Sequence, residues 1–177
     1  MPKSLLIAVS SIVLISCALV CVGFLLPTSY SVLATTEINA SEEALYALVN
    51  ELEAWQRWYP QGNPADKDLK NRYEGPKSGV GAKWHWRRAG RSGSLEILKS
   101  DPLVGLELRM SAPRSQPSIT EIKWSRGAGG KLEVRWMLSG ELGQNPLARY
   151  FASTMEESMQ KQFNQGLSKL KELAEGT

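Results

Sequence analysis

The sequence predicts an α+β domain in which a long C-terminal helix covers one face of an antiparallel sheet, with one membrane helix in front. Three observations indicate this arrangement. An uncharged apolar run opens the chain, alternating segments separated by Gly and Pro turns fill its middle, and a long apolar stripe at helical spacing ends it. Residues 30–177 are of ordinary size for one domain with its own core.

The first element is an apolar run over residues 5–26, and no charged side chain occurs between Lys3 and Glu37. An α-helix rises about 1.5 Å per residue, so this run is long enough for the roughly 30 Å hydrocarbon core of a bilayer. Pro27 ends the helix. We expect a transmembrane helix at 5–26 after an N-terminal cytoplasmic stub, residues 1–4. We also expect the helix to be separate from a domain that begins near residue 30.

Two other interpretations of this segment stay open. Leu14-Ile15-Ser16-Cys17 resembles a bacterial lipobox, in which Cys17 would be lipidated, and Val32-Leu33-Ala34 resembles a weak signal-peptide cleavage site. The apolar run continues well past Cys17, which disfavours the lipobox, and it is longer than the apolar region of a signal peptide.

The orientation follows from the charges that flank the segment. Lys3 precedes it and the first charge after it is Glu37. The positive-inside rule then leaves the N-terminus in the cytoplasm. We expect a single-pass protein of the bacterial inner membrane with its domain in the periplasm.

The next elements are a strand and a helical segment. Residues 29–38 alternate apolar and polar side chains as a strand does, and Ser41 is suited to cap a helix that starts after it. This helix runs past a break near Glu51 to Trp55 and Trp58. Six alternating segments follow, as in an antiparallel meander, at residues 69–74, 80–88, 93–100, 103–110, 118–125 and 131–138.

The last element is predicted as a single helix of nearly 30 residues. Asn145-Pro146 supplies a cap followed by Pro at the first helical position. Apolar side chains then recur at steps of three and four from Leu147 to Leu173. A helix with one apolar stripe of this length must cover a large apolar surface, and the sheet is the only candidate.

Composition excludes several functions. Lys and Arg outnumber Asp and Glu by only 21 to 18, too few to indicate nucleic-acid binding. Cys17 and Cys21 both lie in the apolar run, so the domain has neither a thiol nucleophile nor a disulfide. The only histidine, His85, is expected on the wet face of its strand, and one histidine is too few for a transition-metal site. We expect no metal and no cofactor.

Five stretches, in this order and spacing, resemble a known superfamily: SVLATTEINASEEALYALVNELEAWQRWYP, YEGPKSGVGAKWHW, GSLEILKSDP, KLEVRWMLSGEL and MQKQFNQGLSKLKELAE. The chain resembles the START-like, Bet v 1-like (SRPBCC) superfamily, and within it the bacterial polyketide cyclase/dehydrase-like proteins. The resemblance implies a helix-grip fold, in which a curved antiparallel sheet wraps around the long helix and leaves a cavity for an apolar molecule. It does not imply a reaction.

The candidate cavity residues are large aromatic and flexible side chains predicted on the apolar faces of the strands and on the long helix. They are Trp84, Trp86, Trp124, Trp136, Tyr150, Met155 and Met159. Such side chains suit an adaptable apolar pocket, and they equally suit plain core packing. Both interpretations stay open.

Three functions follow as hypotheses. The first is a membrane-anchored protein that binds a lipid or another apolar small molecule. The second is a cyclase- or dehydrase-type enzyme acting on an apolar substrate, which needs an inward ionisable group such as Arg88, Glu96 or Tyr73. The third is a non-catalytic module that binds a partner protein through an exposed apolar patch.

Overall fold

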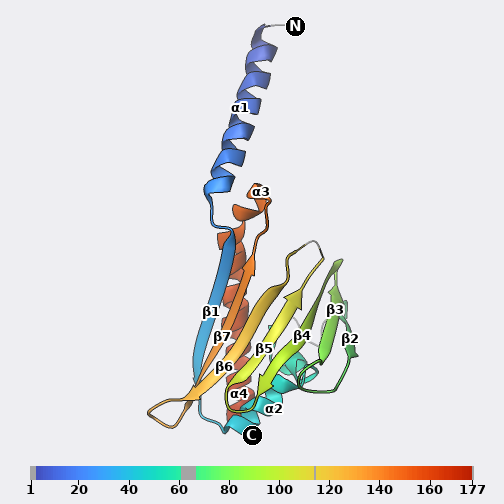
Figure 1. Ribbon diagram of the computed structural model, residues 1–177, viewed down its shortest axis with the longest axis vertical. Coiled ribbons are helices and arrows are strands. Elements are labelled where there is room, and N and C mark those ends of the chain that lie inside the picture. Colours follow the sequence, from blue (N-terminus) through green and yellow to red (C-terminus); the bar gives the residue numbers. More distant parts are fainter. Residues whose placement is uncertain (1–2, 61–66, 114, 177) are drawn as a thin grey trace.

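A seven-stranded antiparallel sheet forms the framework of the domain, in the order β1-β7-β6-β5-β4-β3-β2 (Figure 1). The computed structural model describes residues 3–60, 67–113 and 115–176, without the side chains of residues 5, 6 and 8. The strands are β1 (Ser29–Ile38), β2 (Lys70–Glu74), β3 (Lys83–Arg88), β4 (Arg91–Asp101), β5 (Gly105–Ser111), β6 (Ser118–Arg126) and β7 (Leu132–Glu141).

Strands β2 to β7 form the predicted meander, and β1 pairs with β7. The β1–β7 register runs from Ser29 opposite Glu141 to Ile38 opposite Leu132. The first strand of the domain therefore pairs with the last one, so the sheet joins two segments that lie far apart in the sequence. Two strands start later than predicted, so Val80 and Val104 lie before β3 and β5 and are exposed.

The sheet has the predicted apolar and charged faces. Alternate residues of β7, from Leu132 to Leu138, are buried on the face toward the C-terminal helix. On the other face Glu96 pairs with Lys83 at 3.2 Å and with Arg109 at 3.3 Å. Exposed pairs of this kind contribute little to stability. Burial of the apolar face therefore stabilises the fold.

Helix α2 (Glu42–Asn50) and the 3-10 turn η1 (Ala54–Arg57) follow β1. Ser41 caps α2, because its hydroxyl accepts a hydrogen bond from the Ala44 N–H at 3.1 Å. At the other end the indoles of Trp58 and Trp55 donate to the carbonyls of Leu48 and Val49, at 3.1 and 2.8 Å. These bonds satisfy carbonyls that the end of a helix leaves without a partner. The break predicted near Glu51 is confirmed, and both tryptophans are structural.

Helix α4 (Ala152–Glu175) lies along the apolar face of the sheet. Its buried residues all lie at its midpoint or in its C-terminal half, namely Phe163, Gly166, Leu167, Leu170 and Ala174. Phe163 stacks on the fully buried indole of Trp136, with ring centroids 3.9 Å apart and ring planes 9° from parallel. A Cβ added at Gly166 would lie 2.8 Å from the same indole. This half of α4 therefore packs tightly on the sheet.

The prediction of one continuous C-terminal helix is wrong. The segment is divided into α3 (Pro146–Arg149) and α4, with Tyr150 and Phe151 between them. Asn145 caps α3 as predicted, since its side chain accepts from the Leu147 N–H at 3.0 Å. The division arises because the two helices pack on different surfaces, α3 beside the N-terminal helix and α4 on the sheet.

The N-terminal helix α1 (Lys3–Leu25) occupies the segment predicted to cross a membrane. Counted over the described residues, no helix combines the length and the apolar composition needed for a membrane span. The transmembrane helix predicted at residues 5–26 is therefore not borne out by the structure.

Helix α1 contacts the domain through α3. The Arg149 guanidinium donates to the carbonyls of Gly23, Phe24 and Leu26 at 3.1 to 3.4 Å. The end of a helix leaves such carbonyls without partners, so a cation there is favourable. The sequence pattern did not indicate this partner.

Gly166 tests the close approach of α4 to the sheet. Gly166→Ala raises helix propensity by about 1 kcal/mol but forces a methyl group against a stacked, fully buried indole that has no room to move. We expect a net loss of roughly 1–2 kcal/mol in the free energy of unfolding, measured by denaturant titration. Ser168→Ala, an exposed position of the same helix, is the control and should be neutral or slightly stabilising.

Candidate functional site

A cavity of about 200 Å³ lies between the sheet and the N-terminal half of α4. Its walls come from both layers and from the connection between β5 and β6. The described lining residues are Tyr30, Trp55, Tyr59, Trp86, Leu95, Met110, Ser111, Ala112, Ser115, Gln116, Thr120, Trp136, Leu138, Met155, Met159, Gln162 and Phe163. They are mostly apolar, and none of them is charged.

The cavity exists because α4 contacts the sheet unevenly. From Phe163 onward the helix is packed on the sheet, whereas residues 152–160 include no buried side chain. Met155 and Met159 project into the resulting space, and the stacked Trp136 and Phe163 rings close one end of it. Methionine fills irregular space and adapts its shape, so this wall can accommodate different apolar groups.

The polar side chains in the cavity are uncharged, and some already form hydrogen bonds within the protein. The Thr120 hydroxyl accepts a hydrogen bond from the Trp136 indole at 2.9 Å and donates to the Met137 carbonyl at 3.0 Å. Burial raises the pKa of the Tyr59 phenol to about 12, so this group stays protonated at neutral pH. The cavity therefore favours apolar groups over ions.

The cavity continues into an open hollow of about 610 Å³, the mouth. The two share Tyr30, Ser115, Gln116 and Met155, and the rest of the mouth is lined by Glu141, Leu142, Gly143, Gln144, Asn145, Ala148 and Phe151. These residues belong to the end of the domain where α3 meets α1 (Figure 1). The site is thus apolar inside and more polar where it opens.

The structure brings four of the predicted cavity residues together. Trp86, Trp136, Met155 and Met159 all line the cavity. The other three lie elsewhere, and each contacts a different part of the protein.

Trp84, Trp124 and Tyr150 are absent from the described lining. The Trp84 indole donates to Asn71 at 3.0 Å and is fully buried in the core. Trp124 packs edge-on against Tyr46, with its buried Nε1 lacking a hydrogen-bond partner. The Tyr150 hydroxyl donates to the Leu19 carbonyl of α1 at 2.5 Å.

Several lining residues were not predicted as site residues. Tyr59 and Trp55 come from the segment after α2, and Ala112, Ser115 and Gln116 come from the β5–β6 connection. Alternation identifies the face of a strand but not the position of a loop over it. The inward position of Tyr30 and Thr120 could have been predicted from the sequence, because both lie on the inward side of strands with alternating burial.

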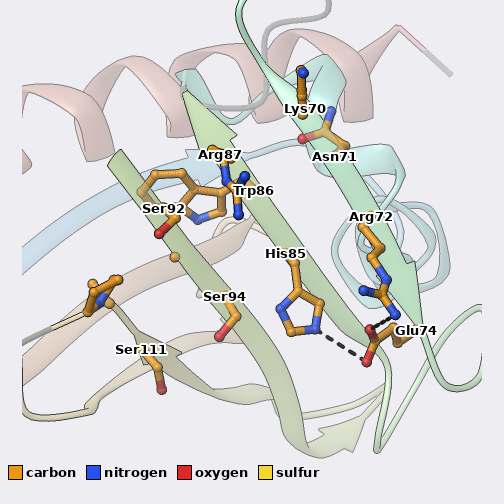
Figure 2. A pocket seen from close by; sticks show the side chains of 13 residues that line it. Lys70, Asn71, Arg72, Glu74, His85, Trp86, Arg87, Ser92, Ser94 and Ser111 are labelled. Carbon is orange, nitrogen blue, oxygen red and sulfur yellow. Dashed lines mark ion pairs between the residues drawn. The ribbon is translucent and has the colours of Figure 1, made fainter. Parts of the chain in front are cut away.

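A second hollow of about 530 Å³ lies on the outer side of β2, β3 and β4 (Figure 2). His85 lies there, as predicted, with Nε2 3.5 Å from the Glu74 carboxylate, which also pairs with Arg72 at 2.8 Å. This hollow is larger than the cavity, but it is open and several of its lining residues are charged. The carboxylate of Glu74 is already paired with Arg72. The cavity under α4, which is less open and has no charged lining residue, is therefore the better ligand site.

The side chains required by an acid–base reaction do not line the cavity. Glu96 is on the outer face in its two ion pairs. Arg88 lines a neighbouring hollow of about 500 Å³, which shares Trp86 and Gln162 with the cavity. Tyr73 accepts a hydrogen bond from Gln56 at 2.6 Å, and burial raises the pKa of its phenol. Within the described ranges, no three His, Cys, Asp or Glu side chains are grouped to hold a metal ion.

Comparison with known proteins agrees with this architecture. Residues 30–175 match the family model for polyketide cyclase/dehydrase and lipid transport. A search of curated proteins found no significant match.

Solved structures share the fold at low sequence identity. Protein CV1439 from Chromobacterium violaceum is 15% identical with a TM-score of 0.61, and the match covers 84% of this chain and 99% of that one. A protein of unknown function from Staphylococcus aureus, SA2116, is 11% identical with a TM-score of 0.65, covering 84% and 94%. Ara h 8.0201 is 13% identical with a TM-score of 0.56, covering 84% and 99%.

The buried phenol of Tyr59 predicts a stability change at high pH. Its pKa is about 12 in the folded protein and 10.0 when unperturbed, so above pH 10 the unfolded chain releases a proton that the folded protein retains. The free energy of unfolding should fall from pH 10 toward pH 12, by roughly 2–3 kcal/mol at the upper end.

Tyr59→Phe removes this contribution and leaves the other titrating groups in place. Denaturant titrations of both proteins across this pH range should show the stability difference shifting in favour of the Phe variant as the pH rises. Parallel pH profiles would contradict the buried environment assigned to Tyr59.

Proposed function

Because the chain belongs to the polyketide cyclase/dehydrase and lipid transport family, we propose that it binds a lipid or another apolar small molecule between the sheet and α4. The observation that carries this proposal is the cavity between sheet and helix with its uncharged, mostly apolar lining. Transfer of apolar surface from water to such a lining is favourable by about 25 cal/mol per Å². The START-like, Bet v 1-like fold supports the same function.

The shape of the site favours an elongated amphiphile. A cavity of about 200 Å³ is smaller than the usual ligand pocket of roughly 300–1,000 Å³, and the mouth supplies additional space. An acyl chain or similar group fits the inner part against Met155 and Met159. A polar end group fits the mouth, where Gln116, Gln144 and Asn145 offer amide donors and acceptors.

Binding is favoured over catalysis. Among the described lining residues the titratable groups are the phenols of Tyr30 and Tyr59. The raised pKa of Tyr59 makes it a poor proton acceptor near neutral pH. The proposal is therefore a binding or carrier protein whose ligand leaves unchanged.

The proposal also includes attachment to a membrane through α1. The described side chains of this helix are mostly apolar, and many are largely exposed, among them Ile7, Leu14 and Leu25. An apolar surface of this kind is typical of a segment that is covered by lipid or by another protein. We propose that the covering phase is the inner membrane, with the domain on its periplasmic side.

The binding site can be tested with a substitution that fills the cavity and a ligand that labels its lining. The full-length protein in membranes is irradiated with a photoactivatable fatty acid, and labelled peptides are mapped by mass spectrometry. We expect labelling of residues 155–163, because Met155, Met159 and Phe163 line the cavity. Met159→Trp should reduce this labelling by about tenfold or more, since the indole occupies the ligand's space.

Ser158→Trp is the matched control, because it places the same side chain on the exposed side of the same helix. It should leave the labelling unchanged. Labelling that is confined to α1, or that Met159→Trp does not reduce, would sink the proposed cavity site.

A charge in α1 tests the membrane attachment. Leu14→Arg introduces a cation in the middle of the helix, which costs about 2.5–3.5 kcal/mol in a bilayer. We expect the protein to move from the membrane pellet to the soluble fraction. Leu103→Arg, at a position with 70% exposure against 71% for Leu14, should stay in the membrane. Equal fractionation of the two variants would contradict the attachment.

A further inference from the structure

Two large apolar side chains beside α1 are exposed although both belong to the predicted apolar stripe. Leu147 of α3 is 51% exposed and Phe151 is 70% exposed. Phe24 and Leu25 at the end of α1 are exposed as well. These four residues, the apolar rim, come from α1, from α3 and from the turn after α3, where the two helices meet. Exposed apolar groups that gather in one region are typical of an interaction surface.

The apolar rim is held in a fixed geometry. Arg149 is only 9% exposed and donates to three carbonyls at the end of α1, while Tyr150 donates to the Leu19 carbonyl. A Cβ added at Gly23 would lie 2.8 Å from the Pro146 carbonyl oxygen, so α1 and α3 are in close contact. The direction of α1 is therefore coupled to the position of α3.

The apolar rim also borders the mouth of the cavity. Phe151 lines the mouth together with Ala148 of α3, and Met155 connects the mouth with the cavity. Figure 1 shows α1 leaving the domain at this end, opposite the end that carries α2 and the C-terminus. The surface beside the mouth thus continues into the exposed apolar side chains of α1.

We propose that the apolar rim rests on the bilayer surface and that the mouth opens onto it, so that the ligand moves between bilayer and cavity without crossing water. The inference rests on the proposed function, because it requires α1 in a membrane and a ligand in the cavity. Continuity with α1 favours lipid over a partner protein, because one phase then covers both surfaces.

The test measures loading of the cavity from the bilayer. Full-length protein is placed in nanodiscs of phosphatidylethanolamine and phosphatidylglycerol that contain the photoactivatable fatty acid, and labelling of residues 155–163 is followed over time. Leu147→Asp should slow loading by about tenfold, because it removes a leucine's burial from the membrane contact. Final labelling should be unchanged, since Leu147 is not among the residues lining the cavity or its mouth.

Leu103→Asp is the matched control, an exposed leucine in the β4–β5 turn at the opposite end of the sheet. It should change neither the rate nor the final labelling. Equal loading rates for Leu147→Asp and wild type would overturn the inference while leaving the cavity site intact. Absence of cavity labelling in the wild type would instead overturn the proposed function.

A second measurement reads the position of the apolar rim directly. In a Cys17→Ser, Cys21→Ser background, a polarity-sensitive fluorophore is attached at Leu147→Cys or Leu103→Cys. The fluorophore at position 147 should be quenched by spin-labelled lipid, and the one at position 103 should not. Quenching at neither position, with the protein still bound to the nanodisc, would overturn the inference. The inference would also be overturned if the wild type formed a dimer that Leu147→Asp abolished without changing the loading rate. In that case a second copy of the chain would cover the apolar rim.

Discussion

The contact between Trp136 and α4 sets the geometry on which the rest of the domain depends. The indole is fully buried, stacks on Phe163 at 3.9 Å and lies against the bare backbone of Gly166. Its Nε1 is satisfied by Thr120, so the ring is buried without an unpaired donor. Trp55, Trp58 and Tyr59 pack around it within 6.0 Å between ring centroids. This cluster brings the C-terminal half of α4 close to the sheet.

The same contact leaves the other half of α4 over open space. Residues 152–160 of this helix include no buried side chain. The space beyond Phe163 is bounded by two methionines, which adapt their shape rather than fill a fixed volume. Core packing and a ligand cavity are thus successive parts of one interface. Both interpretations of the tryptophans apply: Trp84 belongs to the core, Trp86 lines the cavity, and Trp136 does both.

The division between α3 and α4 gives the domain a second packing surface. Arg149 is turned toward α1 and compensates the partial negative charge at the end of that helix. The division separates the apolar stripe into a buried part and an exposed part at the mouth. Ligand entry and the attachment of α1 are therefore located at the same end of the molecule.

Local patterns in the sequence determined the elements themselves: the alternation of β7, the Ser41 cap, the Asn145-Pro146 helix start and the break near Glu51. Each depends on residues a few positions apart, and such short-range constraints are legible in one chain. The face of each strand followed in the same way, and so did the outward position of His85. Only the tertiary structure decided that β1 pairs with β7, that Arg149 binds the end of α1 and that Trp86, but not Trp84, lines the cavity. Alternation places both tryptophans on one face, but whether a side chain meets core or cavity depends on the helix packed above it, and that distance is set by residues such as Gly166 far away in the sequence.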